Sequence, residues 1–318
     1  MDVSIVIPVF NEAANLELLE RRLMPAARAL GRSFEIIFID DGSSDDSLER
    51  LKGWAGRCPE VRVVELSRNF GQHAAIFAGF AQCKGAVVVT LDADLQNPPE
   101  EIGKLLAKID EGYDCVGGWR VQREDSLLRK IPSRLNNWLT RRATGVHLHD
   151  YGSMLRAYRR PVVEAMLQVR EVSSYIPVLA NSFARRVCEI PVAHEERAAG
   201  ESKYSYWKLI NLQFDLVTSY STWPLQLLFF IGGFIALLGL GLSALLLVRR
   251  FVLGAEVEGV FTLFAILFFF VGCQFAAFGL LGEYIGRIYT QVRRRPKYII
   301  SKVYGADAAV DKAAPSPS

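Results

Sequence analysis

Two long apolar blocks near the carboxyl end constrain this chain more than any other feature of its sequence. Residues 223–248 and 260–282 contain no Lys, Arg, Asp or Glu. Each is longer than the roughly 20 apolar residues that a helix needs to cross a hydrocarbon core about 30 Å thick. A buried core helix is the alternative for one such block, but two in succession favour a membrane. We therefore predict two transmembrane helices, 223–248 and 260–282, joined by a connector at 249–259.

The charges on either side of these blocks predict how the chain is oriented. Residues 1–4 lead straight into an apolar run, without the basic stretch and cleavage site of a secretory signal, so residues 1–203 are expected in the cytoplasm. A basic cluster follows the second block and contains Arg287, Arg293, Arg294, Arg295 and Lys297. The positive-inside rule places this cluster in the cytoplasm as well. Arg249 and Arg250 in the connector favour the opposite orientation, but they are fewer.

The first part of the chain alternates apolar runs with stretches of helical character. The strand candidates are Val3–Val9, Phe34–Ile39, Val61–Leu66, Ala86–Leu91 and Tyr113–Gly117. This alternation predicts an α/β domain, residues 1–203, with a mostly parallel sheet wrapped by helices. Asn97 as the N-cap, Pro98 at the first helical position and Glu100 at the third predict the start of a helix.

The segments around the apolar blocks differ from this domain. Residues 204–222 carry Tyr204, Tyr206, Trp207 and Phe214, and they are predicted to form an interfacial juxtamembrane helix. Residues 126–145 form a basic amphipathic pattern, for which a plain surface helix and an interfacial membrane helix both remain open. Residues 283–318 are predicted to be a cytoplasmic basic segment with a disordered tail. The net charge of +3 is too small to favour a nucleic-acid partner.

Polar clusters follow three of the predicted strands. Asn11 and Glu12 follow the first, Asp40 to Ser43 follow the second, and Asp92 to Gln96 follow the fourth. Each cluster alone is common in turns. Because ligands of open α/β sheets bind outside the carboxyl ends of the strands, three clusters at equivalent ends predict one shared crevice.

The third of these clusters has the composition of a metal site. Asp92 and Asp94 are separated by one residue, and Gln96 is a third oxygen donor within reach. Mg²⁺ and Mn²⁺ prefer oxygen ligands and commonly share them with phosphates. The cluster therefore predicts a divalent metal ion, Mn²⁺ or Mg²⁺, that binds a nucleotide diphosphate and neutralises charge as the diphosphate leaves.

Three sequence runs carry a resemblance to a known family. They are Ser4–Glu12, Asp40–Asp45 and Asp92–Gln96. The chain resembles the family 2 glycosyltransferases, specifically the polyprenyl-phosphate branch with the dolichyl-phosphate mannose synthases, from Val3 to about Lys203 and through both apolar blocks. Finer runs are similar to members that transfer 4-deoxy-4-formamido-L-arabinose to undecaprenyl phosphate in Gram-negative bacteria; they include Asn69–Ile76, Asp150–Arg160, Gly200–Ser205 and Gly282–Tyr289.

This resemblance implies a GT-A fold (Rossmann-like) and inverting transfer from a UDP-linked sugar to undecaprenyl or another polyprenyl phosphate. It also implies a bacterial inner-membrane protein with a cytoplasmic catalytic domain and a periplasmic connector. The other implied partners are membrane lipids and further copies of the chain, a tetramer being common in the family. The donor sugar stays open, since glucose or another hexose is an alternative. A non-enzymatic lipid-binding or flippase-accessory protein would be expected to lose its metal ligands, which are present here.

The resemblance also assigns roles to individual residues. The implied nucleotide-sugar site contains Pro8, Asn11, Glu12, Asp41, Asp92 and Ala93. The implied metal ligands are Asp92, Asp94 and Gln96. The implied acceptor-phosphate site contains Arg120, Arg134, Arg197, Ser202 and Lys203. The candidate catalytic residues are Asp94, Asp150 and Arg120. Two roles remain open: Asp150 could orient a substrate or cap a turn, and His73 could be structural or touch the donor.

A lipid phosphate is already mostly dianionic at neutral pH, because its second pKa is near 6. It can therefore attack the sugar without a strong general base. Catalysis is then expected to rest on positioning and charge stabilisation.

Overall fold

The computed structural model of the 318-residue chain describes residues 1–120, 153–169, 175–195, 223–253, 260–293 and 295–305. The chain divides into two compact units. The first unit combines Met1–Ser205 with Arg295–Ser318, and the second is Tyr206–Arg294. We describe each unit by itself.

The first unit is built on one mixed sheet. Within the described residues, eight strands lie in the order β7-β5-β6-β4-β1-β2-β3-β8. Their bounds are β1 Val3–Val9, β2 Phe34–Asp40, β3 Val61–Leu66, β4 Val87–Thr90, β5 Cys115–Arg120, β6 Arg156–Arg159, β7 Val187–Val192 and β8 Ile300–Tyr304. The five strands predicted from the sequence are all present, with ends that differ by a few residues.

The strand directions confirm a mostly parallel sheet. β1 pairs in parallel with both β2 and β4, β2 with β3, and β5 with β7. β6 runs antiparallel between β4 and β5, and β8 runs antiparallel along β3. The antiparallel strands were not predicted, because β6 is a short run and β8 follows the second apolar block.

Helices cover both faces of this sheet. They are α1 Ala13–Ala29, α2 Ser47–Arg57, α3 Gln72–Gln82, the 3₁₀ helix η1 Pro99–Glu101, α4 Ile102–Asp110, α6 Arg160–Gln168 and α7 Ile176–Phe183. One core cluster joins Ile5 and Ile7 of β1 to α1, α2 and α4. The other joins Val6 of β1 to α3, α6 and α7. Neighbouring residues of β1 thus enter different cores, as expected of a strand that is buried on both faces.

The predicted helix start at Asn97 is wrong. Pro98 has extended backbone angles, φ −60° and ψ 133°, and helical structure begins with η1 at Pro99. The reason is local: the ring of Pro99 disfavours helical angles at the residue before it, so Pro98 cannot be the first helical residue.

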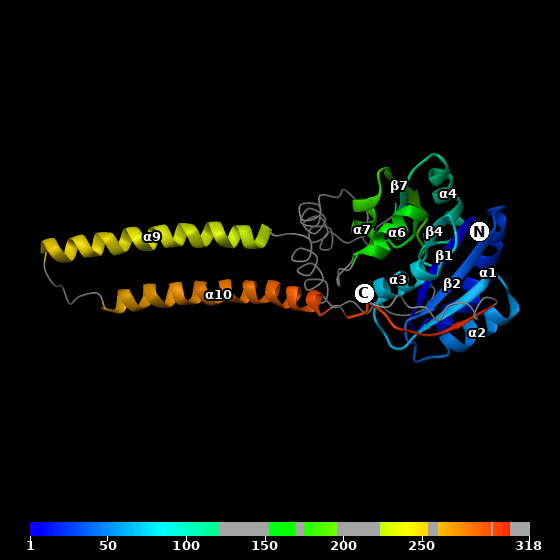
Figure 1. The fold of residues 1–318 in the computed structure, drawn as a ribbon, viewed down its shortest axis with the longest axis horizontal. Helices are drawn as coiled ribbons and strands as arrows, with labels where there is room; N and C mark the ends of the chain where they lie inside the picture. Colours follow the sequence, from blue (N-terminus) through cyan, green and yellow to red (C-terminus); the bar gives the residue numbers. More distant parts are fainter. Residues whose placement is uncertain (121–152, 170–174, 196–222, 254–259, 294, 306–318) are drawn as a thin grey trace. The chain divides into compact units, whose positions relative to one another are not determined.

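The carboxyl-terminal segment adds an edge strand to the sheet. β8 pairs with β3 from Val63↔Tyr304 to Leu66↔Ile300, and the red strand in Figure 1 runs along this edge. Before β8, Lys297 donates to the carbonyl of Val169 at 2.9 Å and lies 4.2 Å from the Phe77 ring centroid. Residues predicted as a basic cytoplasmic segment are therefore partly built into the first unit.

In the described part of the second unit there are two long helices, α9 Trp223–Leu253 and α10 Val260–Val292. Both extend beyond the apolar blocks 223–248 and 260–282. By length and composition, the described part of the chain holds one segment able to cross a bilayer, Phe269–Thr290 within α10.

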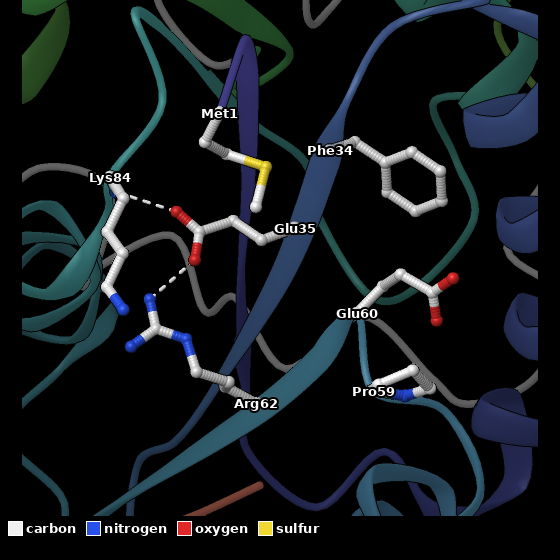
Figure 2. A pocket seen from close by; sticks show the side chains of 7 residues that line it. All are labelled: Met1, Phe34, Glu35, Pro59, Glu60, Arg62 and Lys84. Carbon is white, nitrogen blue, oxygen red and sulfur yellow. Dashed lines mark hydrogen bonds and ion pairs between the residues drawn. The ribbon is translucent and has the colours of Figure 1, made fainter. Parts of the chain in front are cut away.

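A buried ion pair holds the amino ends of the central strands. Figure 2 shows Glu35 of β2 between Lys84 and Arg62, beside a pocket of about 200 Å³. Glu35 accepts from the Arg62 guanidinium at 2.6 Å, the Lys84 backbone N–H at 2.6 Å and the Ser4 hydroxyl at 2.5 Å. Arg62 also donates to the carbonyl of Gln82 at 2.6 Å. The pair ties β2 and β3 to the end of α3.

We predict that Glu35→Ala strongly destabilises the protein, because Arg62 would keep a buried charge without its partner. Breaking such a pair costs about 3–5 kcal/mol, or about 10 °C in Tm for a domain of this size. Thermal unfolding of the detergent-solubilised full chain measures the effect. Glu60→Ala, at an acid that lines the same pocket, is the matched control and should change Tm little. Equal Tm values for Glu35→Ala and Glu60→Ala would contradict the prediction.

Candidate active site

The carboxyl ends of β1, β2 and β4 meet at one edge of the sheet. Val9 of β1 lies opposite Asp40 of β2, and the Asp41 N–H donates to the Val9 carbonyl at 2.9 Å. On the other side, Val6 lies opposite Thr90 of β4, and the Leu91 N–H donates to the Val6 carbonyl at 3.1 Å. The three polar clusters predicted from the sequence therefore follow neighbouring strands at the same edge.

Pro8 ends the pairing between β1 and β4. Because Val6 accepts from Leu91 and residues along a strand alternate sides, Pro8 also faces β4. A proline has no N–H, so it cannot donate the next hydrogen bond of this ladder. The chain after Leu91 is thereby free of β1. It carries Asp92 and Asp94 at the same sheet edge as the loops after β1 and β2.

Asn11 joins the loop after β1 to the loop after β2. Its backbone has φ 56°, a conformation that asparagine adopts more readily than most residues. The side-chain oxygen of Asn11 accepts from the Ser44 N–H at 2.8 Å, and its own N–H donates to the Ser43 hydroxyl at 3.1 Å. The neighbouring Glu12 carboxylate accepts from the amide of Asn15. Part of the bonding capacity of Asn11 and Glu12 thus holds these loops in place.

Asp41 fixes a third loop at this edge. It is only 3% exposed and accepts the backbone N–H groups of Phe70 at 2.7 Å and Gly71 at 2.9 Å. Burial raises the pKa of its carboxyl, although the two N–H donors counteract the rise in part. Gly42 has φ 70°, and a Cβ there would lie 2.6 Å from the Arg68 carbonyl carbon. Only glycine permits this close approach of the two loops.

In the segment from Asp92 to Gln96, buried apolar residues alternate with polar residues. Ala93 and Leu95 are buried in the core, at 4% and 2% exposure. Leu95 has φ 61°, which is rare for a residue of its size and typical of positions that function or packing constrains. The Asp92 carboxylate accepts from the side-chain amide of Gln72 at 2.7 Å, and the Asp94 carboxylate accepts from the Gln96 N–H at 3.2 Å.

The side-chain oxygen atoms of this segment are compatible with a hard cation. Asp92, Asp94 and Gln96 offer oxygen atoms from one short loop. No group of three or more His, Cys, Asp or Glu side chains that could hold a metal ion occurs among the described residues. Such an incomplete set suits Mg²⁺ or Mn²⁺, which commonly completes its coordination with phosphate oxygens and water.

The strands on the other half of the sheet reach the same edge. Arg120 is the last residue of β5 and lies opposite Val192, the last residue of β7. Beyond β7, the Glu195 N–H donates to the Gln96 carbonyl at 3.0 Å. The other predicted residues of this region lie outside the described residues; they are Arg134, Asp150, Arg197, Ser202 and Lys203.

Comparison with known families decides the class of this site. The model described as glycosyl transferase family 2 matches residues 4–167, which is more than half of the chain. The chain belongs to glycosyl transferase family 2. As a glycosyltransferase of this family, it carries its acidic clusters at the sheet edge where α/β proteins bind ligands.

Curated relatives of this family 2 glycosyltransferase match nearly its whole length. The protein of Yersinia enterocolitica is 56% identical over 96% of this chain and 94% of its own. Those of Pseudomonas aeruginosa and Photorhabdus laumondii are 56% and 54% identical, over 96% and 97% of this chain and 91% and 96% of their own. All three are named undecaprenyl-phosphate 4-deoxy-4-formamido-L-arabinose transferase.

A solved structure supports the fold of this family 2 glycosyltransferase. Glucosyl-3-phosphoglycerate synthase from Mycobacterium tuberculosis, in complex with Mn²⁺, UDP and phosphoglyceric acid, matches with a TM-score of 0.53. The match covers 68% of this chain and 76% of the synthase at 20% identity. At this identity the match shows the shared fold alone.

Two residues of the site were not assigned from the sequence. Gln72 stands in the run Asn69–Ile76, yet no sequence pattern connects its amide to Asp92. Ser44 follows the Asp-Asp-Gly-Ser run, and no sequence pattern connects it to Asn11. Only the folded loops bring each side chain to its partner.

His73 of this glycosyltransferase is packed rather than solvated. It lies in the first turn of α3, and its ring meets the edge of Tyr175 at a centroid distance of 5.2 Å. Burial lowers its pKa to about 4, so the imidazole is neutral at physiological pH. Within the described residues its buried Nδ1 has no hydrogen-bond partner. A neutral, packed ring does not supply a positive charge to a phosphate.

We predict that His73 makes the protein less stable as the pH falls from about 6.5 to 4. The pKa of His73 in the folded protein lies below the ordinary value of 6.5. As the pH falls from 6.5 to 4, the imidazole is therefore protonated in the unfolded chain before it is protonated in the folded protein, which favours unfolding. Glutamine does not titrate, so the Tm of the His73→Gln variant should fall less than that of the wild type when the pH is lowered from 7 to 5. Identical losses of Tm would contradict the prediction.

Proposed function

We propose that this protein transfers 4-deoxy-4-formamido-L-arabinose from a UDP-linked donor to undecaprenyl phosphate. The reaction takes place at the cytoplasmic face of a bacterial inner membrane. The observation that carries this proposal is the identity of 54–56% with relatives named for that transfer, over 91% or more of their length.

The donor occupies the crevice at the carboxyl ends of β1, β2 and β4. Asp92, Asp94 and Gln96 would hold a Mn²⁺ or Mg²⁺ ion, which would act as a Lewis acid and neutralise charge on the diphosphate. The nucleotide side is formed by Pro8, Asn11, Glu12, Asp41 and Ala93. Asp41 contributes mainly through the loop that it holds, since both of its oxygens accept N–H groups of Phe70 and Gly71.

The acceptor phosphate binds to the basic residues Arg120, Arg134, Arg197 and Lys203 and to the hydroxyl group of Ser202. The position of Arg120 at the carboxyl end of β5 supports this assignment. Glu195, which lies two residues before Arg197 in the sequence, forms a hydrogen bond with Gln96 and gives further support. The dianionic phosphate attacks the anomeric carbon from the face opposite the diphosphate, which inverts that carbon. Asp150 orients the sugar or one of the basic side chains.

The helices α9 and α10 form two membrane spans. β8 belongs to the same sheet as β3, so residues 300–304 and 61–66 lie in one compartment. The chain between them must therefore cross a membrane an even number of times. If Phe269–Thr290 of α10 crosses, a second crossing is required, and α9 is the long apolar helix available for it.

We predict that Asp94→Ala strongly reduces metal-dependent transfer. The loss should be about 10²–10³-fold in kcat, the scale of removing one charge-stabilising group. The assay measures sugar transfer from a panel of UDP-sugars, including the formamido-arabinose and glucose donors, to undecaprenyl phosphate by purified protein with and without Mn²⁺. Asp110→Ala, at a surface acid at the end of α4, is the control.

Either of two outcomes would overturn part of this proposal. Transfer from another UDP-sugar alone would keep the lipid-phosphate chemistry and reject the donor. Folded protein that transfers no sugar from any donor would reject the enzymatic function.

We also predict that the connector 249–259 lies outside the cytoplasm and that the chain end lies inside it. A specific protease site inserted at 254–259 should be cut in intact spheroplasts, because two crossings place it in the periplasm. The same site placed after Gly305 should be cut only in inverted vesicles. Cleavage of both sites from the same side would contradict two spans.

A further inference from the structure

Arg22 on α1 binds two carboxylates from distant parts of the chain. Its Nε and one terminal nitrogen donate to Glu100 at 3.0 and 2.9 Å. Its two terminal nitrogens donate to Glu195 at 2.7 and 3.0 Å. Both pairs are bidentate, the arrangement that gives arginine–carboxylate pairs their geometric specificity. We call Arg22, Glu100 and Glu195 the Arg22 clasp.

The clasp joins the two sides of the proposed site. Glu100 lies in η1, four residues after Gln96 of the proposed metal loop. Glu195 follows β7 and donates its own N–H to the Gln96 carbonyl at 3.0 Å. The side chain and the backbone of Glu195 are therefore both tied to the segment Gln96–Glu100. Arg22 is the common point through which these segments are held.

The clasp is poorly suited to a role in overall stability. The side chains of Glu100 and Glu195 are about half exposed, and exposed ion pairs contribute little to folding. α1 is already anchored by Leu16, Leu19 and Leu23 in the core. The planar guanidinium does, however, fix the relative position of the two carboxylates. Its hydrogen bonds raise the pKa of Arg22 and lower that of Glu195, so both groups stay charged at neutral pH.

We propose that Arg22 is a positioning residue for the acceptor, and that the clasp sets the distance between the proposed metal loop and the chain leading to Arg197. This inference rests on the proposed function, in which Arg197 binds the lipid phosphate. Arg22 does not touch a substrate. It aligns the attacking phosphate with the donor by holding Glu195 against Gln96, and a shift of about 1 Å in such an alignment can cost about 10²-fold in rate.

The test compares neighbouring arginines on α1. Arg22→Ala should raise the KM for undecaprenyl phosphate and lower kcat, together by about 10–100-fold in kcat/KM. Binding of UDP with Mn²⁺, measured by calorimetry, should change less than about twofold, because the hydrogen bonds that hold Asp92 and Asp94 do not involve Arg22. Arg21→Ala is the matched control, since Arg21 forms an exposed pair with Glu17 one turn away. It should behave as the wild type.

Two further variants separate positioning from loss of structure. Arg22→Lys should recover only part of the activity, since an ammonium cannot bind both carboxylates in a bidentate manner. Arg22→Ala combined with Glu195→Gln should cost little more than either change alone, because both remove the same contact. Three results would overturn the inference: fully additive losses of kcat/KM in the double variant, a loss of UDP binding in Arg22→Ala as large as its loss of kcat/KM, or an unchanged kcat/KM in Arg22→Ala.

A structural measurement keeps this inference distinct from the proposed function. Hydrogen exchange of the Glu195 amide, which donates to Gln96, should be faster in Arg22→Ala than in Arg21→Ala. If the wild type transfers no sugar but the Glu195 amide exchanges faster in Arg22→Ala, the proposed function fails and the clasp stands as a structural connection. If the wild type transfers sugar and Arg22→Ala leaves the exchange of this amide unchanged, only the inference about the clasp fails.

Discussion

The parallel pairing of β1 with β2 and β4 is the constraint on which the site depends. It places Val9 beside Asp40 and Val6 beside Thr90, so that the loops after three strands leave from one edge. Pro8 then interrupts the ladder on the β4 side and lets the chain with Asp92 and Asp94 diverge. A shift of register would separate these loops, and no single acidic residue could bring them together again.

The loops at this edge are held mainly by one another. Asn11 binds the loop of Ser43 and Ser44, Asp41 binds the loop of Phe70 and Gly71, and Gln72 binds Asp92. These contacts are short hydrogen bonds between polar groups that sequence patterns alone would assign to a ligand. Much of the polar character of the site therefore serves to order it before a donor binds, which reduces the entropy lost on binding.

The segment after α10 returns to the first unit and adds β8 to its sheet. β8 pairs with β3, Tyr304 donates to Glu65 at 2.6 Å, and Gly305 approaches the Val61 carbonyl so closely that a Cβ would lie 2.8 Å away. The chain thus leaves the first unit before α9 and returns to it after α10. This return supports the proposal that the chain crosses a membrane an even number of times.

The sequence by itself determined the class of fold and the sheet edge at which the three polar clusters meet. Alternating apolar runs predicted β1 to β5, and the clusters at Asn11, Asp41 and Asp92 predicted the edge, because strand periodicity and strand ends are local properties of a chain. The sequence did not predict β8 or the helix start at Pro99, and it did not predict the partners of Arg22. Those features required the tertiary structure, because Arg22, Glu100 and Glu195 are separated by 78 and 173 residues along the chain and meet only when α1, η1 and the end of β7 pack on one sheet.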